Sequence, residues 1–307
     1  MVSNRQQSAR IMAALATILL VAACAGASPG SGSTSASATL PAPTPVGSGA
    51  AAEDYWLRLT TSQAIPPLDR FEVLPSLWIT GDGHAVVPLV LPTPYPGPLV
   101  QGLSGRTVSD AGRAAIVQEA RDLGLLGGQT DFSSDAPLPG GVVGQIELVV
   151  DGTRVTLTGD PSAHIECVTA PCDPPPGSAA AFGAFWNQLL DLPSWLGSDL
   201  GPPMPYDPPA YALVVGPPPD PEPPLSPPPA DWPLDQPLAS FGARVANGTA
   251  RCGTVSGADA DALRPALDAA NQLTPWVQDP ETSATFGLTV RPMVSGEDAC
   301  KESFGVG

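Results

Sequence analysis

Positively charged residues are few in this chain. The 307 residues include a single lysine, Lys301, and two histidines, against 30 acidic residues, and the formal net charge is −17. Proteins that bind the phosphate backbone of nucleic acids need clustered Lys and Arg side chains. The composition therefore excludes nucleic acid as a partner. No glycine-rich phosphate-binding loop contains a lysine, and we expect no bound cofactor.

The sequence also lacks an apolar run long enough to form a permanent membrane-spanning helix. Arg5 and Arg10 precede a run of about twelve apolar residues, which ends in Val21-Ala22-Ala23-Cys24. This pattern is typical of a signal peptide. Small residues before a cysteine resemble the lipobox of bacterial lipoproteins, and the resemblance implies cleavage before Cys24 and acylation of Cys24. The alternatives are an ordinary signal peptide or an uncleaved anchor, with Cys24 incidental.

The segment that follows Cys24 contains no charged residue. Of positions 25–52, 26 are Ala, Gly, Ser, Thr or Pro, and such a composition cannot bury enough apolar area to fold. We expect residues 24–52 to form the lipidated cysteine and a flexible tether. Two acyl chains suffice for stable anchoring, so the predicted location is the extracytoplasmic face of a bacterial cell membrane.

Proline and glycine are abundant, at 40 and 32 residues. The stretch 202–237 contains 16 prolines, which predicts an irregular crossing in polyproline II conformation and excludes both helix and central strand. The alternative is that this stretch is a ligand for a proline-binding domain.

Turn and capping signals predict an α+β fold for the rest of the chain. Ser109 and Asp110 are expected to begin a helix that ends at Gly124. The other expected elements are strands at Arg70–Thr80 and His84–Leu91 around Gly81-Asp82-Gly83, a hairpin of Gly141–Val150 and Thr153–Thr158 around Asp151-Gly152, a helix at Ala179–Leu192 and a short strand at Tyr211–Val215.

A repeated pattern suggests two related halves. Thr107-Val108-Ser109 and Thr254-Val255-Ser256 are each followed by a helical pattern and then a strand pattern. Pro265 is expected near the start of the second helix, because a proline costs about 3 kcal/mol in a helix interior. The predicted organisation is a signal peptide (1–23), the tether (24–52), an N-terminal half (53–200), a proline-rich connection (201–237) and a C-terminal half (238–307).

Four cysteines accompany Cys24. An even number in an exported chain indicates two disulfides, and four cysteines allow three connectivities. We favour Cys167–Cys172, which closes a short loop, and Cys252–Cys300, which links the last helical unit to the segment after its strand.

No complete catalytic motif is present. His164-Ile165-Glu166 and Pro171-Cys172 resemble parts of a zinc deaminase site, but their spacing is wrong and the second cysteine of that motif is absent. A zinc site of His164, Cys167 and Cys172 is the minor alternative to a disulfide. His84 follows a tight turn, where a solvated imidazole is the simplest expectation.

Two tryptophans are candidates for a binding surface. Trp232 and Trp276 each lie beside a proline, and we expect both to be partly exposed aromatic residues that contact a ligand or partner.

Several short motifs resemble a family of uncharacterised bacterial lipoproteins. They are Trp78-Ile79-Thr80-Gly81-Asp82-Gly83-His84, Leu123-Gly124-Leu125-Leu126, Ala270-Asn271-Gln272-Leu273-Thr274-Pro275-Trp276 and Val290-Arg291-Pro292. The resemblance spans about residues 76–300. It implies an envelope location and assigns no catalytic residue.

The function that we predict from the sequence is a non-catalytic binding or interaction module, tethered to the membrane by lipid, with an envelope protein as its partner. The first alternative is a secreted hydrolase that uses Asp or Glu with His84 or His164. The second is a solute-binding lipoprotein.

Overall fold

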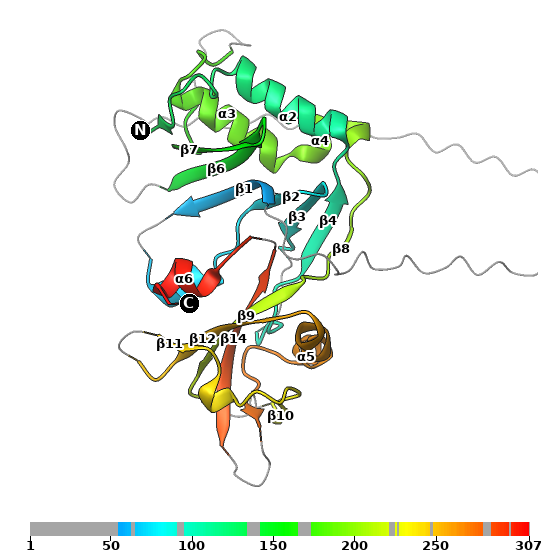
Figure 1. The fold of residues 1–307 in the computed structure, drawn as a ribbon, viewed down its shortest axis with the longest axis vertical. Coiled ribbons are helices and arrows are strands. Elements are labelled where there is room, and N and C mark those ends of the chain that lie inside the picture. The colour runs from blue at the N-terminus through cyan, green and yellow to red at the C-terminus, as the bar shows by residue number, and fades with distance from the viewer. Residues whose placement is uncertain are drawn as a thin grey trace, which may run out of the picture. The chain divides into compact units, whose positions relative to one another are not determined.

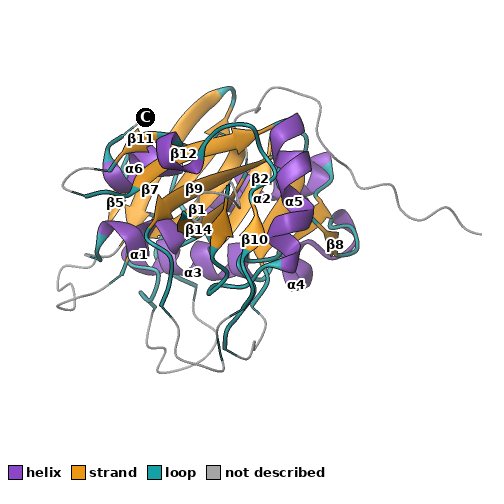
Figure 2. Ribbon diagram, turned by 90° about the horizontal axis from the view of Figure 1, so that it is seen from below, coloured by secondary structure: helices purple, strands orange, loops and turns teal. Residues whose placement is uncertain are grey.

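The computed structural model describes residues 55–62, 65–90, 95–133, 142–164, 173–220, 225, 227–245, 248–278, 284–294 and 296–306. All of them belong to one compact unit, residues 44–307. The described part contains six α-helices and fourteen strands, and the strands form two mixed, open sheets (Figures 1 and 2). The predicted α+β class is therefore confirmed.

The first sheet has eight strands in the order β5-β7-β6-β1-β2-β3-β4-β8. Except for the parallel β5–β7 contact, neighbouring strands are antiparallel. The bounds are β1 (Tyr55–Ser62), β2 (Leu77–Thr80), β3 (His84–Pro88), β4 (Leu103–Thr107), β5 (Asp131–Phe132), β6 (Val143–Val150), β7 (Thr153–Gly159) and β8 (Met204–Pro205).

Three helices cover one face of this sheet: α2 (Asp110–Asp122), α3 (Ala179–Leu190) and α4 (Leu192–Leu196) (Figure 1). The predicted cap of α2 is present, since the Ser109 side chain accepts a hydrogen bond from the Gly112 N–H at 3.0 Å. Ile116 on α2 is fully buried against the sheet. A short 3₁₀ helix, η1 (Gly197–Asp199), follows α4.

The second sheet has six strands in the order β10-β13-β14-β9-β12-β11. The bounds are β9 (Ala210–Gly216), β10 (Ala230–Asp231), β11 (Ala243–Arg244), β12 (Arg251–Ser256), β13 (Trp276–Val277) and β14 (Thr285–Met293), with a 3₁₀ helix η2 (Leu238–Ser240) between β10 and β11. Helix α5 (Ala258–Ala269) packs its buried leucines, Leu263 and Leu267, against one face of this sheet.

Strand β9 confirms the short strand predicted at Tyr211–Val215 and corrects the expectation that the proline-rich stretch contains no central strand. It pairs with β12 on one side and with β14 on the other. The physical reason is local, because Pro209 and Pro217 bracket seven residues that contain no proline. These seven residues keep every N–H that two sheet neighbours require.

Two further expectations about element bounds were wrong. Residues 70–72 belong to helix α1 (Pro67–Glu72), because Pro66 and Pro67 favour a helix start, and the strand begins only at Leu77. Pro265 lies in the interior of α5. It is on the exposed side of the helix, and the burial of Leu263 and Leu267 around it outweighs the one lost helical hydrogen bond.

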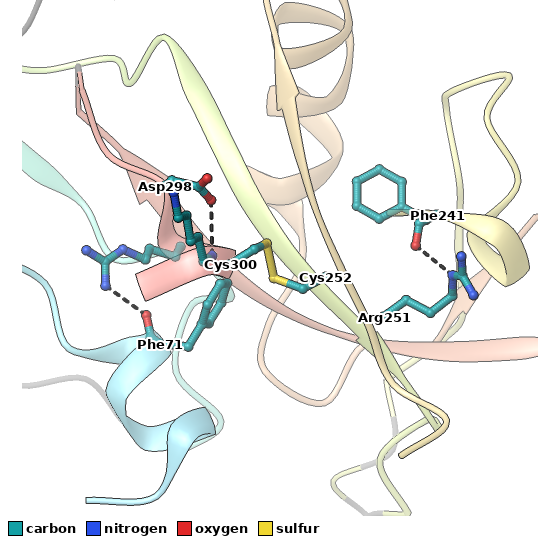
Figure 3. Close-up of a disulfide and its surroundings, with 8 residues drawn as sticks. Phe71, Phe241, Arg251, Cys252, Asp298 and Cys300 are labelled. Atoms are coloured by element: carbon teal, nitrogen blue, oxygen red, sulfur yellow. Dashed lines mark hydrogen bonds between the residues drawn. A yellow bond between two sulfur atoms is a disulfide. The ribbon is translucent and has the colours of Figure 1, made fainter. Parts of the chain in front are cut away.

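The sequence halves are not independent, because α1 packs into the second sheet. Phe71 of α1 is fully buried in a cluster that includes Val214, Met293 and the disulfide-bonded Cys252 and Cys300. Figure 3 shows the Phe71 ring beside the disulfide. Helix α6 (Ala299–Phe304) carries Cys300 and contacts α1.

Candidate functional site

A groove of about 430 Å³ lies alongside strand β14. Its walls come from segments that are far apart in the sequence. The lining residues are Glu72, Leu74, Leu89, Val90, Pro98, Leu99, Gln101, Gly102, Gln272, Leu288, Thr289, Val290, Arg291 and Pro292. The five consecutive residues Leu288–Pro292 form one side of the groove, so the groove follows the backbone of β14.

Among the described residues, no strand lies beside most of one edge of β14. Residues Gly287–Met293 pair with β9, whereas the opposite edge pairs with the two-residue strand β13 only at Thr285 and Phe286. Within the described residues, no strand pairs with that edge of β14 beyond Phe286. The groove therefore runs beside a strand edge that no described strand covers, which we call the unpaired edge of β14.

The opposite wall begins where the β3–β4 hairpin ends. The Leu89 N–H donates to the Gly102 carbonyl at 2.8 Å, which extends the hairpin by one bond. Leu89 is 39 % exposed and Val90 is 90 % exposed. Isolated solvent-facing apolar residues are common, but two consecutive ones on the wall of a groove offer an apolar contact surface.

Residues 97–99 hold this wall against the second half of the chain. Pro98 and Asn271 form an isolated antiparallel bridge, and the Leu99 N–H donates to the Ala270 carbonyl at 3.3 Å. The Gln272 N–H donates to the Gly97 carbonyl at 3.1 Å. Both sides of the groove are thus fixed by backbone hydrogen bonds.

Glu72 is the acidic residue of the groove. It is exposed, and burial of part of its side chain, followed by repulsion from Asp69, raises the pKa of its carboxyl group. Arg291, also in the lining, donates to the Phe71 and Val73 carbonyls and pairs with Glu297 at 2.8 Å. Because Glu297 neutralises Arg291, the groove presents a net negative charge to a ligand.

A second, shallower depression lies over helix α2 and the ends of β1 and β6. Its lining includes Trp56, Arg113 and Arg121. Arg113 pairs with Asp110, and Arg121 pairs with Asp151 at 3.3 Å. Both arginines are therefore occupied by carboxylates of the same chain, and this depression is a weaker candidate.

The structure does not bring the two histidines into one site. His84 lies at the start of β3, and its Nε2 is 3.7 Å from Asp82 Oδ2. His164 is exposed, and its Nδ1 lies 3.0 Å from the Ser162 carbonyl oxygen. No group of three or more His, Cys, Asp or Glu side chains among the described residues could hold a metal ion.

The structure joins Cys252 and Cys300 in a disulfide, which is the pairing that the sequence favours. Its Cα atoms are 5.7 Å apart, and Cys252 lies on β12 while Cys300 lies on α6. Cys24, Cys167 and Cys172 lie outside the described residues.

The expectation that Trp232 and Trp276 form an exposed binding surface was wrong. Trp232 is 6 % exposed and Trp276 is fully buried, and their rings meet edge-to-face at 6.0 Å. Both belong to the core between α5 and the second sheet. The prolines beside them indicated irregular backbone, but irregular segments can also cover a core.

Sequence reasoning missed every residue of the groove as a site residue. The motif Val290-Arg291-Pro292 contributed only to the family resemblance and was not predicted to form a site. A usable signal was the proline in a strand pattern, because a proline within a strand favours an edge. The opposite wall carried no such signal, since only the fold places residues 89–102 beside β14.

No protein-family model matches the chain, and neither curated proteins nor solved structures show a significant match to it. Among the described residues, no helix is both long and apolar enough to cross a membrane.

Proposed function

We propose that this chain is a lipid-anchored lipoprotein of the bacterial envelope that binds another envelope protein without catalysing a reaction. The groove beside β14 carries this proposal. It combines an unpaired strand edge with an exposed apolar wall, and this combination suits recognition of a polypeptide.

The sequence supports the location. Val21-Ala22-Ala23-Cys24 resembles a lipobox, and residues 25–52 have the composition of a flexible tether with an r.m.s. span of roughly 30 Å. Such a tether would hold the acidic folded part away from anionic lipid headgroups, which repel it.

Metabolic labelling and fractionation test the anchor. The wild-type chain should incorporate labelled palmitate and sediment with membranes, whereas Cys24→Ser should do neither. The variant Cys172→Ser is the matched control, because it removes a different cysteine and should leave labelling unchanged. Equal labelling of wild type and Cys24→Ser would contradict the lipid anchor.

In-cell photo-crosslinking tests the binding function. The photoreactive residue p-benzoylphenylalanine replaces Val90 in one form and Leu190 in another, since both side chains are exposed. Val90 lines the groove, and Leu190 lies on α3. Reproducible capture of one envelope protein, reduced when Cys24→Ser is added, would support the proposal. If neither form captures a protein above background, solute binding and hydrolysis become the leading functions.

A further inference from the structure

We infer that the groove binds an extended segment of the partner protein as an added strand along β14, with a Lys or Arg of that segment facing Glu72. This inference rests on the proposed binding function and names its site, its mode and the chemistry of its ligand.

The backbone of β14 offers hydrogen bonds on its open edge. In an antiparallel pair, alternate residues direct their N–H and C=O groups toward the partner strand. Pro292 pairs with Tyr211 of β9 but has no N–H, and proline in a sheet is placed where the missing donor faces away from the partner. The alternation then directs the N–H and C=O groups of Leu288 and Val290, and the Pro292 carbonyl, into the groove.

Unpaired strand edges favour the addition of another strand. Leu288, Val290 and Pro292 supply two donors and three acceptors on the same edge. A β-strand of five residues, which is about 17 Å long, would match residues 288–292. A small solute could not satisfy this row of alternating groups, so a polypeptide is the occupant that fits the geometry.

The opposite wall determines which side chains of the bound segment are favoured. Leu89 and Val90 face the edge of β14 across the groove, together with Pro98 and Leu99. Burial of apolar side chains against them would stabilise the complex. The segment should therefore alternate apolar residues with others, as strands with one covered face do.

The charge of the groove favours a ligand of the opposite charge. No ion-pair partner of Glu72 is present within the part of the chain that the structure describes, and Asp69 is close enough to raise its pKa. The whole chain carries a net charge of −17. Both facts favour a basic side chain beside Glu72 and disfavour an acidic segment.

The test uses the full-length chain with p-benzoylphenylalanine in place of Val90, crosslinked in cells. Mass spectrometry of the crosslinked peptide should identify a segment with alternating apolar residues and at least one Lys or Arg. Two added substitutions should each reduce the crosslink at least tenfold: Val290→Pro removes one outward N–H, and Glu72→Lys reverses the charge that faces the ligand.

Matched controls separate these effects from loss of fold. Asp122→Lys makes the same charge change at an exposed position of α2, away from the groove, and should leave the crosslink unchanged. Thermal unfolding of each variant checks folding. If Val290→Pro fails to fold, Glu72→Lys alone decides the question.

The outcomes distinguish this inference from the proposed function. Capture of a partner through position 190 but not through position 90 would overturn the groove and leave the binding function standing. A crosslinked segment that is acidic, or a crosslink insensitive to both Val290→Pro and Glu72→Lys, would also overturn it. Absence of capture at both positions would overturn both proposals.

A second measurement needs no partner. Residue-resolved amide hydrogen exchange of the full chain should show Leu288 and Val290 exchanging at least tenfold faster than Thr289 and Arg291. The last two amides bond to β9 in this arrangement, whereas the first two face the groove. Equal protection of all four amides would show that the edge is already covered and would overturn the inference.

Discussion

Arg291 Nη2 lies 2.8 Å from Glu297 Oε1, and the two side chains are 5 % and 0 % exposed. Arg291 also donates to the carbonyls of Phe71 and Val73, so this one side chain ties β14 to helix α1. Burial raises the pKa of the Glu297 carboxyl group, and Arg291 only partly offsets that effect.

Arg58 of β1 connects this ion pair to the first sheet, since its Nη1 lies 3.9 Å from Glu297 Oε1. Arg58 of β1 pairs with Glu147 at 2.7 Å and with Glu302 of α6 at 3.1 Å. Burial by itself would lower the pKa of Arg58, but Glu302 and Glu147 raise it above its usual value. The contact with Glu302 joins the first sheet to the C-terminal helix, whereas Glu147 lies opposite Arg58 within the first sheet.

Arg291→Met should lower the free energy of unfolding by about 3 kcal/mol at pH 7. It leaves the buried Glu297 carboxylate with the more distant Arg58 Nη1, at 3.9 Å, as its counter-charge. With the pKa of Glu297 raised in the folded state, the folded protein binds a proton more tightly than the unfolded chain does. Stability is therefore lost as the pH rises. The difference in unfolding free energy between the wild type and Arg291→Met should shrink toward pH 4.

Urea unfolding from pH 4 to pH 8 measures this dependence. The double variant Arg291→Met/Glu297→Gln is the control, because it removes both charges and should recover part of the lost stability without the pH dependence. A deficit for Arg291→Met that is independent of pH would contradict the assignment to Glu297.

The Cys252–Cys300 disulfide should contribute more to stability than a disulfide between Cys167 and Cys172. On the chain-entropy view, a bridge that closes a 48-residue separation contributes about 4 kcal/mol, and one that closes a five-residue separation about 2 kcal/mol. Cys300→Ser should therefore reduce the melting temperature more than Cys172→Ser. Equal shifts in calorimetry would count against this pairing.

Trp276 should act as a core residue and not as a ligand contact. Trp276→Ala should reduce the free energy of unfolding by about 3–5 kcal/mol, because it removes a fully buried indole. Trp276→Phe should be milder, since it keeps a ring and also removes a buried indole N–H that has no hydrogen-bond partner among the described residues. Denaturant titration compares the two, and equal losses would show that ring packing is not the dominant contribution.

Alkaline pH should destabilise the fold through two tyrosines. Burial raises the pKa of Tyr55 to about 12 and that of Tyr206 to about 12, whereas an unfolded tyrosine titrates near 10. Between about pH 10 and pH 12 the folded protein retains protons that the unfolded chain releases, so stability falls as the pH rises. Thermal melts at pH 9–12 test this, with Tyr206→Phe expected to reduce the slope; a flat profile from pH 10 to pH 12 would contradict it.

Elements with strong local signals were predicted well from the sequence. The serine cap of α2, the Asp151-Gly152 turn and the broad apolar face of α3 are each specified by a few neighbouring residues. Asp151 and Gly152 both have positive φ values, which such a turn requires. Their conformations are favoured by residues a few positions apart in the sequence.

Predictions failed where tertiary contacts outweigh local preference. The cost of a proline inside α5 was real, but the leucines on the buried side of the helix offset it. The short strand predicted at Tyr211–Val215 is present, but the proline-rich composition of residues 202–237 gave no sign that it lies inside a sheet and pairs on both edges. Trp232 and Trp276 looked exposed because the sequence does not show which surface their segments cover.

The sequence by itself determined the α+β class, the acidic charge and the turns and caps, because these follow from composition and from residues a few positions apart. The tertiary structure decided the groove. Its two sides, residues 288–292 and residues 89–102, lie nearly 200 positions apart in the chain. The backbone bonds between residues 97–99 and 270–272 and the packing of α1 and α6 between the sheets hold them side by side. Such a contact depends on long-range burial and paired charge, for which no short stretch of sequence carries a signal.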